Sequence, residues 1–148
     1  MRKYIALFAI AVTGIATFAG CTKKSSGSQP HMTASIGVFP YSAPYAIAYR
    51  DKGQMIIEGL GGTTTTPTLP YIVLHLNNYV GLTGVYPIDS TGENGAEYVT
   101  GQTEFLFSRI GTIVITSASQ DRIKGSFTFL CSDSTMVNSG DFDAAIKN

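Results

Sequence analysis

From residue 31 onward, apolar and polar residues alternate with a period of two, which is typical of half-buried β-strands. The alternation is clearest between residues 122 and 131. One face of that strand would carry Ile123, Gly125, Phe127, Phe129 and Cys131, and the other Arg122, Lys124, Ser126 and Thr128. No stretch after residue 20 shows a sustained 3.6-residue period, so the pattern predicts an all-β domain.

Turn-forming residues divide this part of the chain into short segments. Their spacing predicts about eight to ten strands, separated by turns rich in Gly, Asn, Asp and Pro. Because strands that are neighbours in sequence usually pair, we expect an antiparallel meander. Such a meander either closes as a lipocalin-like barrel or folds as a β-sandwich.

Glycines and prolines set the expected limits of several strands. Pro40 is expected to end the first strand, and residues 61–70 (GGTTTTPTLP) are expected to form a loop. Residues 103–108 and 111–117 are expected to be separate short strands. Gly140 is expected to interrupt the last strand of the chain.

Residues 1–20 are predicted to be a signal peptide. Two basic residues follow Met1, and an uncharged apolar run that is too short for a comfortable transmembrane helix comes next. The run ends in Phe18-Ala19-Gly20-Cys21, which resembles the lipobox of a bacterial lipoprotein, although Phe18 stands where Leu is usual. An ordinary secretory signal cut near Ala19 or Gly20 is the alternative. Because a cysteine stands where diacylglycerol is attached, we expect lipidation of Cys21.

The residues after the lipobox indicate how the chain is held and where. Residues 21–30 are polar and are expected to form a flexible tether, and residues 31–148 are expected to form a single domain. Asp at position 22 would suggest inner-membrane retention, and Thr22 does not. Some lipoproteins carry an acidic surface-export patch where this chain has Lys23-Lys24. We therefore expect an outer-membrane lipoprotein whose domain faces the periplasm rather than the cell surface.

The charge of the domain argues against nucleic-acid binding, and the cysteine content argues against an intrachain disulfide. From residue 31 onward the chain has six basic and ten acidic residues, so it lacks the basic surface that nucleic-acid binding requires. If Cys21 is lipidated, Cys131 has no partner for an intrachain disulfide. Cys131 lies within an apolar alternation, so we expect it to be a small buried side chain rather than a reactive thiol.

Residues with catalytic or metal-binding chemistry are few. His31 is expected to be solvated, and His75 to lie in a strand beside Tyr71 and Val73, with no Cys/His cluster for a metal. Asp141 and Asp143 share a strand face that could begin a calcium site, although a solvated face is the simpler interpretation. The chain has no Gly-x-Ser-x-Gly elbow, Ser-x-x-Lys motif or phosphate-binding glycine loop. We therefore expect no enzyme activity, no resident metal and no cofactor.

Other features allow recognition of a ligand. Seven tyrosines could line a sugar- or lipid-binding surface, or simply pack across strands. The Thr-rich segment 61–68 is a solvated linker or a recognition loop. Asp-Ser-Thr occurs at 89–91 and 133–135, in expected turns, and resembles an O-glycosylation acceptor of some bacteria. The seven tyrosines are Tyr41, Tyr45, Tyr49, Tyr71, Tyr79, Tyr86 and Tyr98.

Six short motifs occur in an order that resembles a family of small Bacteroidota lipoproteins of unknown function. The resemblance covers nearly the whole domain and implies an all-β lipoprotein without a known activity. Members often carry Trp or Phe after a Lys-Pro in the first turn, where this chain has Val38-Phe39-Pro40-Tyr41. The motifs lie at Met32–Gly37, Gln54–Ile57, Leu82–Tyr86, Gly111–Thr116, Gly125–Phe129 and Gly140–Asp143.

These observations favour a non-catalytic structural or binding module, held at the membrane through Cys21. The alternative is a lipocalin-like carrier with a small apolar ligand inside a barrel. A protein, a glycan or a small apolar molecule are the candidate partners besides the membrane. An empty apolar cavity of several hundred Å³ would favour the carrier.

The anchor has a direct test. Replacing Cys21 by Ala removes the only thiol at the lipobox, so metabolic labelling with a fatty-acid analogue is expected to disappear. Labelling that persists in Cys21→Ala would contradict the anchor.

Overall fold

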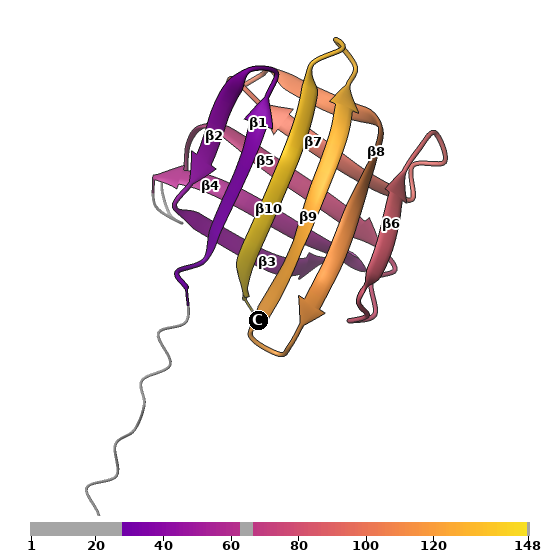
Figure 1. Ribbon diagram of the computed structural model, residues 1–148. Coiled ribbons are helices and arrows are strands. Elements are labelled where there is room, and N and C mark those ends of the chain that lie inside the picture. Colours follow the sequence, from indigo (N-terminus) through magenta and orange to yellow (C-terminus); the bar gives the residue numbers. More distant parts are fainter. Residues whose placement is uncertain (1–27, 63–66, 148) are drawn as a thin grey trace, which may run out of the picture.

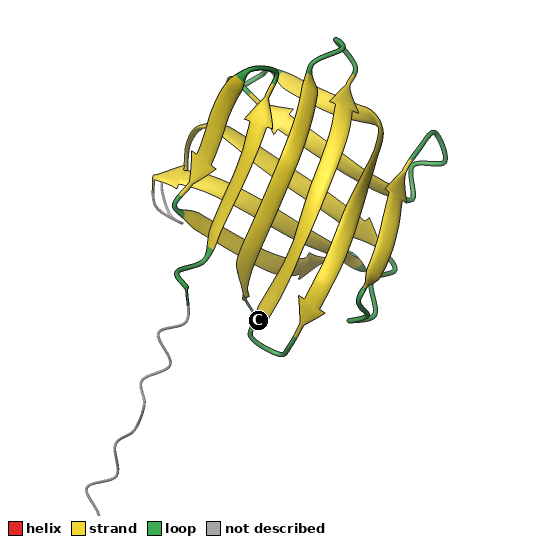
Figure 2. Cartoon of the chain, viewed as in Figure 1, coloured by secondary structure: helices red, strands yellow, loops and turns green. Residues whose placement is uncertain are grey.

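The computed structural model describes residues 28–62 and 67–147, and within them the chain forms strands and loops without a helix (Figure 2). The predicted signal peptide and Cys21 lie outside the described residues. The ten strands are β1 (His31–Ile36), β2 (Phe39–Ala43), β3 (Tyr45–Asp51), β4 (Gln54–Gly62), β5 (Pro67–Asn77), β6 (Gly84–Ile88), β7 (Asn94–Val99), β8 (Phe105–Ala118), β9 (Arg122–Cys131) and β10 (Met136–Ile146).

Seven of these strands close a barrel, which confirms the predicted all-β class and selects the lipocalin-like barrel over the β-sandwich. The hydrogen-bonded circuit runs β3-β4-β5-β7-β8-β9-β10 and returns to β3. Strands β1 and β2 extend the sheet beside β10, and β6 pairs with β8. In Figure 1 the barrel is flattened into two layers, and β3, β4, β5 and β7 cross behind the other strands.

The order of the strands departs from a simple meander in two places. Strand β10 pairs with β3 in parallel, through Ala145–Ile47 and Ile146–Ala48, whereas every other pair is antiparallel. Strand β6 lies beside β8 instead of between β5 and β7. Both departures arise because β8 and β10 are long enough to change neighbours along one edge. Strand β8 pairs first with β7 and then with β6, and β10 pairs first with β1 and then with β3.

Side chains fill the interior of the barrel. The predicted alternation on β9 is confirmed, because Ile123, Phe127, Phe129 and Cys131 are all buried. The ring of Phe127 lies 6.1 Å from that of Phe129 and 6.3 Å from that of Phe142, measured between ring centroids. Isoleucine and leucine side chains from the opposite layer complete this core. They include Ile57, Ile72, Leu74 and Leu76.

Gly140 does not break the last strand, contrary to the expectation from sequence. Strand β10 continues through it, although its register against β9 shifts between Val137 and Gly140, and a Cβ at this position would lie 2.5 Å from the ring of Phe127. The glycine therefore makes room for an aromatic ring of the neighbouring strand. Residues 103–108 and 111–117 are likewise not separate strands, since β8 is continuous from Phe105 to Ala118.

Two expectations based on proline were also wrong. Pro40 lies inside β2, and the first strand ends earlier, at a turn where Gly37 has a φ of 59°. Strand β2 is an edge strand, so a proline there removes no bond from the sheet. In the expected loop 61–70, β4 extends to Gly62 and β5 begins at Pro67, while residues 63–66 lie outside the described residues. Strand β5 begins to pair with β7 only at Tyr71, so its prolines also lie where one edge has no partner.

Candidate functional site

Each histidine singled out from the sequence lies beside one acidic side chain, and the two histidine–acid pairs do not come together in one cluster. His75 Nε2 on β5 lies 3.1 Å from Glu97 Oε1 on the adjacent strand, and His31 Nε2 lies 3.8 Å from Asp141 Oδ1. Within the described ranges, no three His, Cys, Asp or Glu side chains gather as metal ligands do. The same residues contain no helix long and apolar enough to span a membrane.

Asp143 lies on the outer surface of the barrel but is not solvated, because its side chain is only 5% exposed. Its carboxylate accepts hydrogen bonds from Arg122 Nε at 2.7 Å and from the Ser28 hydroxyl at 2.7 Å. The Lys124 ammonium lies 2.9 Å from the same carboxylate. Arg122, Lys124 and the Ser28 hydroxyl therefore bind the carboxylate that the sequence suggested as a calcium ligand.

The environment of Asp143 changes its acidity. Burial opposes ionisation, but the hydrogen bonds from Ser28, Lys124 and Arg122 outweigh that effect and lower the pKa of this carboxyl to about 2. The charged form is therefore the stable one in the folded chain at neutral pH. Arg122 and Lys124 come from the start of β9, directly beside β10.

This cluster also fixes the point at which the N-terminal segment reaches the barrel. Arg122 Nη2 donates to the Ser28 carbonyl oxygen at 2.7 Å, in addition to the Ser28–Asp143 bond. Ser28 is thus held by its backbone and by its side chain. Of the predicted tether, residues 21–27 lie outside the described residues, and its described end is attached to β9 and β10 at Ser28.

The seven tyrosines do not form one surface. Tyr41 and Tyr79 are buried, and Tyr41 donates its hydroxyl to the Gly59 carbonyl oxygen at 2.6 Å. Tyr49 bonds Glu58 at 2.7 Å across the β3–β4 pair. The tyrosines therefore pack between strands for the most part, and the aromatic residues that are most exposed are phenylalanines.

A largely apolar hollow lies where the β1–β2 and β9–β10 turns meet the end of β7. We call it the distal groove, and its volume is about 630 Å³. Tyr98 and Leu106 belong to the residues packed against the core, and Thr100, Ser134 and Thr135 add hydroxyl groups. Its apolar lining consists of Ile36, Val38, Phe39, Tyr98, Leu106 and Met136.

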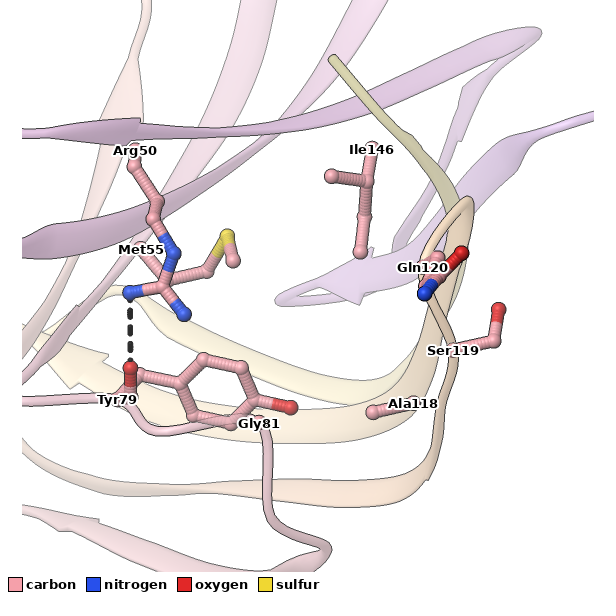
Figure 3. Close-up of a pocket in the computed structure, with 8 residues that line it drawn as sticks. All are labelled: Arg50, Met55, Tyr79, Gly81, Ala118, Ser119, Gln120 and Ile146. Atoms are coloured by element: carbon pink, nitrogen blue, oxygen red, sulfur yellow. Dashed lines mark hydrogen bonds between the residues drawn. The ribbon is translucent and has the colours of Figure 1, made fainter. Parts of the chain in front are cut away.

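A second hollow, of about 380 Å³, lies at the other end of the barrel, near the Ser28–Arg122 contact. We call this the anchor end, and the hollow the anchor-end pocket, because the predicted lipidation site Cys21 precedes Ser28 in the chain. Figure 3 shows Arg50, Met55 and Tyr79 facing the turn that contains Ser119 and Gln120. Arg50 Nη1 donates to the Tyr79 carbonyl oxygen at 2.9 Å. The Tyr79 hydroxyl is buried and has no hydrogen-bond partner among the described residues.

Strand β9 separates the two hollows. It begins at Arg122, just after the turn that lines the anchor-end pocket, and ends at Cys131, just before the turn that lines the distal groove. At about 3.3 Å per residue, its length places the two turns about 30 Å apart. Ser28 bonds Arg122, two residues after Gln120, so the N-terminal segment reaches the barrel near this turn, although Ser28 itself lines a separate hollow with His31 and Tyr45.

Cys131 is fully buried, as predicted, and burial, with a smaller effect of the Asp133 charge, raises the pKa of its thiol to about 11. Both Asp-Ser-Thr segments form the expected turns, since the Asp89 and Asp133 carboxylates each accept the backbone N–H two residues later at 2.8 Å. These two carboxylates are tied to local backbone and are directed toward neither hollow.

Sequence patterns missed both hollows, because each is built from segments that are far apart in the chain. One signal was available. Val38 and Phe39 follow Gly37, and Val80 and Leu82 flank Gly81, so large apolar residues stand at turns where polar ones are usual. All four are exposed in the structure.

No family model, curated protein or solved structure matches this chain.

The Asp143 cluster predicts a defined acid sensitivity. Because the folded-state pKa lies below the unfolded value near 4, the cluster stabilises the fold above about pH 4, and this contribution is lost as the pH falls to about 2. Asp143→Asn is expected to cost about 2 kcal/mol at pH 7 and to flatten the stability curve between pH 4 and 2. Urea unfolding at several pH values measures both effects.

Asp141→Asn is the matched control, two residues away on the same face but exposed. It is expected to change stability by less than about 0.5 kcal/mol. Equal losses in the two variants would show that the Ser28–Arg122–Lys124 contacts do not stabilise Asp143.

Proposed function

We propose that this protein is a lipid-anchored, non-catalytic binding module of the bacterial envelope that holds a small apolar ligand in its distal groove. The observation that carries the proposal is the position of that groove, at the end of the barrel away from Ser28. A tether attached at Ser28 leaves the groove turned away from the lipid-bearing residue. We expect the protein to be located at the outer membrane, with its domain facing the periplasm.

The filled interior argues against a ligand inside the barrel. Lipocalin-like carriers leave their central space open, whereas Phe127, Phe129 and Phe142 occupy it here. A ligand would instead lie across the mouth, on Tyr98 and Leu106. Two functions were considered from the sequence, a binding module and a carrier of an apolar ligand. Both are combined here in a module that binds an apolar ligand at one end of the barrel.

The size and lining of the groove support a small amphipathic ligand. About 630 Å³ lies within the range of about 300–1,000 Å³ that is common for small-molecule sites. The apolar lining suits an acyl chain or a ring system, and the hydroxyls of Ser134 and Thr135 stand at the rim for a polar end group. None of the residues that line the groove is charged, which favours binding over acid–base chemistry.

A fluorescent fatty acid tests this assignment. The mature chain with Cys21→Ser is expected to bind cis-parinaric acid, and Phe39→Asp is expected to weaken binding about tenfold or more. The ring of Phe39, 72% exposed in the free protein, would become covered by the ligand, and a carboxylate there would have to lose its hydration. Fluorescence titration measures both affinities, and thermal unfolding checks that the variant is folded.

Val85→Asp provides the control, because Val85 is 67% exposed on β6 but lies outside the groove. Its affinity is expected to equal that of the unsubstituted chain. Binding that is lost equally in Val85→Asp, or unaffected by Phe39→Asp, would overturn the assignment of the groove.

A further inference from the structure

The segment between β5 and β6 exposes two large apolar side chains at the anchor end. Val80 is 73% exposed and Leu82 is 62% exposed, on either side of Gly81. Gly81 has a φ of 87°, which favours glycine, and the Tyr86 hydroxyl donates to the Leu82 carbonyl oxygen at 2.9 Å. The segment is therefore a shaped turn that presents apolar groups to its surroundings.

This turn lies on the same end of the barrel as Ser28. Gly81 lines the anchor-end pocket together with Ser119 and Gln120, and the β8–β9 turn then leads into Arg122, which bonds Ser28. Cys21 precedes Ser28 by seven positions in the sequence. Seven residues span at most about 25 Å, so a lipid on Cys21 would keep this end of the barrel close to the bilayer.

Basic residues lie close to this turn. Arg50 lines the anchor-end pocket and Lys52 lies in the turn between β3 and β4, whereas Arg122 and Lys124 at the start of β9 are paired with Asp143. Anionic lipid surfaces attract basic groups and repel acidic ones within about 10 Å.

We propose that the anchor end is a docking face for an anionic bilayer, in which Val80 and Leu82 enter the boundary between headgroups and acyl chains while Arg50 faces a lipid phosphate. This inference rests on the proposed lipid anchor at Cys21, and it adds the orientation of the barrel relative to the membrane. Apolar side chains beside basic groups form the pattern by which proteins lie on a membrane surface. The distal groove then points away from the bilayer.

The anchor-end pocket supplies polar partners for a headgroup. The Arg50 guanidinium can pair with a phosphate in a charge-assisted hydrogen bond, and Arg50 is positioned by its bond to the Tyr79 carbonyl oxygen. The buried Tyr79 hydroxyl beside it lacks a partner among the described residues, and Gln120 adds an amide across the pocket (Figure 3). Residues with arginine, amide and hydroxyl groups thus line one hollow at the face that the lipid anchor would hold against the membrane.

Tryptophan fluorescence tests the docking face directly, because the natural chain contains no tryptophan. The lipidated Leu82→Trp protein is reconstituted into phosphatidylcholine vesicles that contain phosphatidylglycerol. Its emission is expected to shift to shorter wavelength, and brominated phosphatidylcholine is expected to quench most of it. Val38→Trp, at the distal groove, is the matched control and is expected to show neither effect.

Two further arms separate this inference from the proposed anchor. Fatty-acid labelling of the same preparations reports lipidation of Cys21 independently of docking. The unlipidated Cys21→Ser form of Leu82→Trp, mixed with concentrated phosphatidylglycerol vesicles, is expected to be quenched at low salt, and the additional change Arg50→Gln is expected to reduce that quenching severalfold. If the lipidated Leu82→Trp protein behaves like Val38→Trp, or if Arg50→Gln leaves quenching unchanged, the docking face is wrong. Failure of labelling alone would overturn the anchor.

Discussion

The pairing of β10 with three other strands is the constraint on which the rest of the molecule depends. One edge of β10 bonds β9, and the other bonds first β1 and then β3, in parallel. The short β10–β3 contact closes the circuit of seven strands, so the apolar faces of both layers enclose one core. The same strand carries Phe142 inward and Asp143 outward, and thereby links the closed core to the segment at Ser28.

Because side chains fill the closed barrel, the two hollows to which we assign roles lie at its ends. The distal end has a groove with an uncharged lining, and the anchor end has a pocket that contains Arg50. Strand β9 spans the distance between these two ends, which is about 30 Å. The proposed ligand site and the proposed membrane contact lie at opposite ends of the barrel, so occupation of one would leave the other accessible.

The sequence predicts those features that depend on local alternation, and it misses those that depend on distant neighbours. The burial of Phe127 and Phe129 follows from the period of two on one strand. Gly140 was misjudged because its role is to accommodate Phe127 of the next strand, and Pro40 because its tolerance depends on β2 being an edge. Asp143 acquires its partners from Ser28 and from β9, and neither contact has a local sequence signal.

Hydrogen exchange of the lipidated protein on anionic vesicles, compared with the same protein in detergent, tests most directly whether the two ends have different roles. The account predicts slower exchange on the vesicles for peptides that cover residues 78–84 and 118–121. It predicts unchanged exchange for residues 37–39 and 134–136, which border the distal groove. Protection of the groove segments together with free exchange at 78–84 would contradict it.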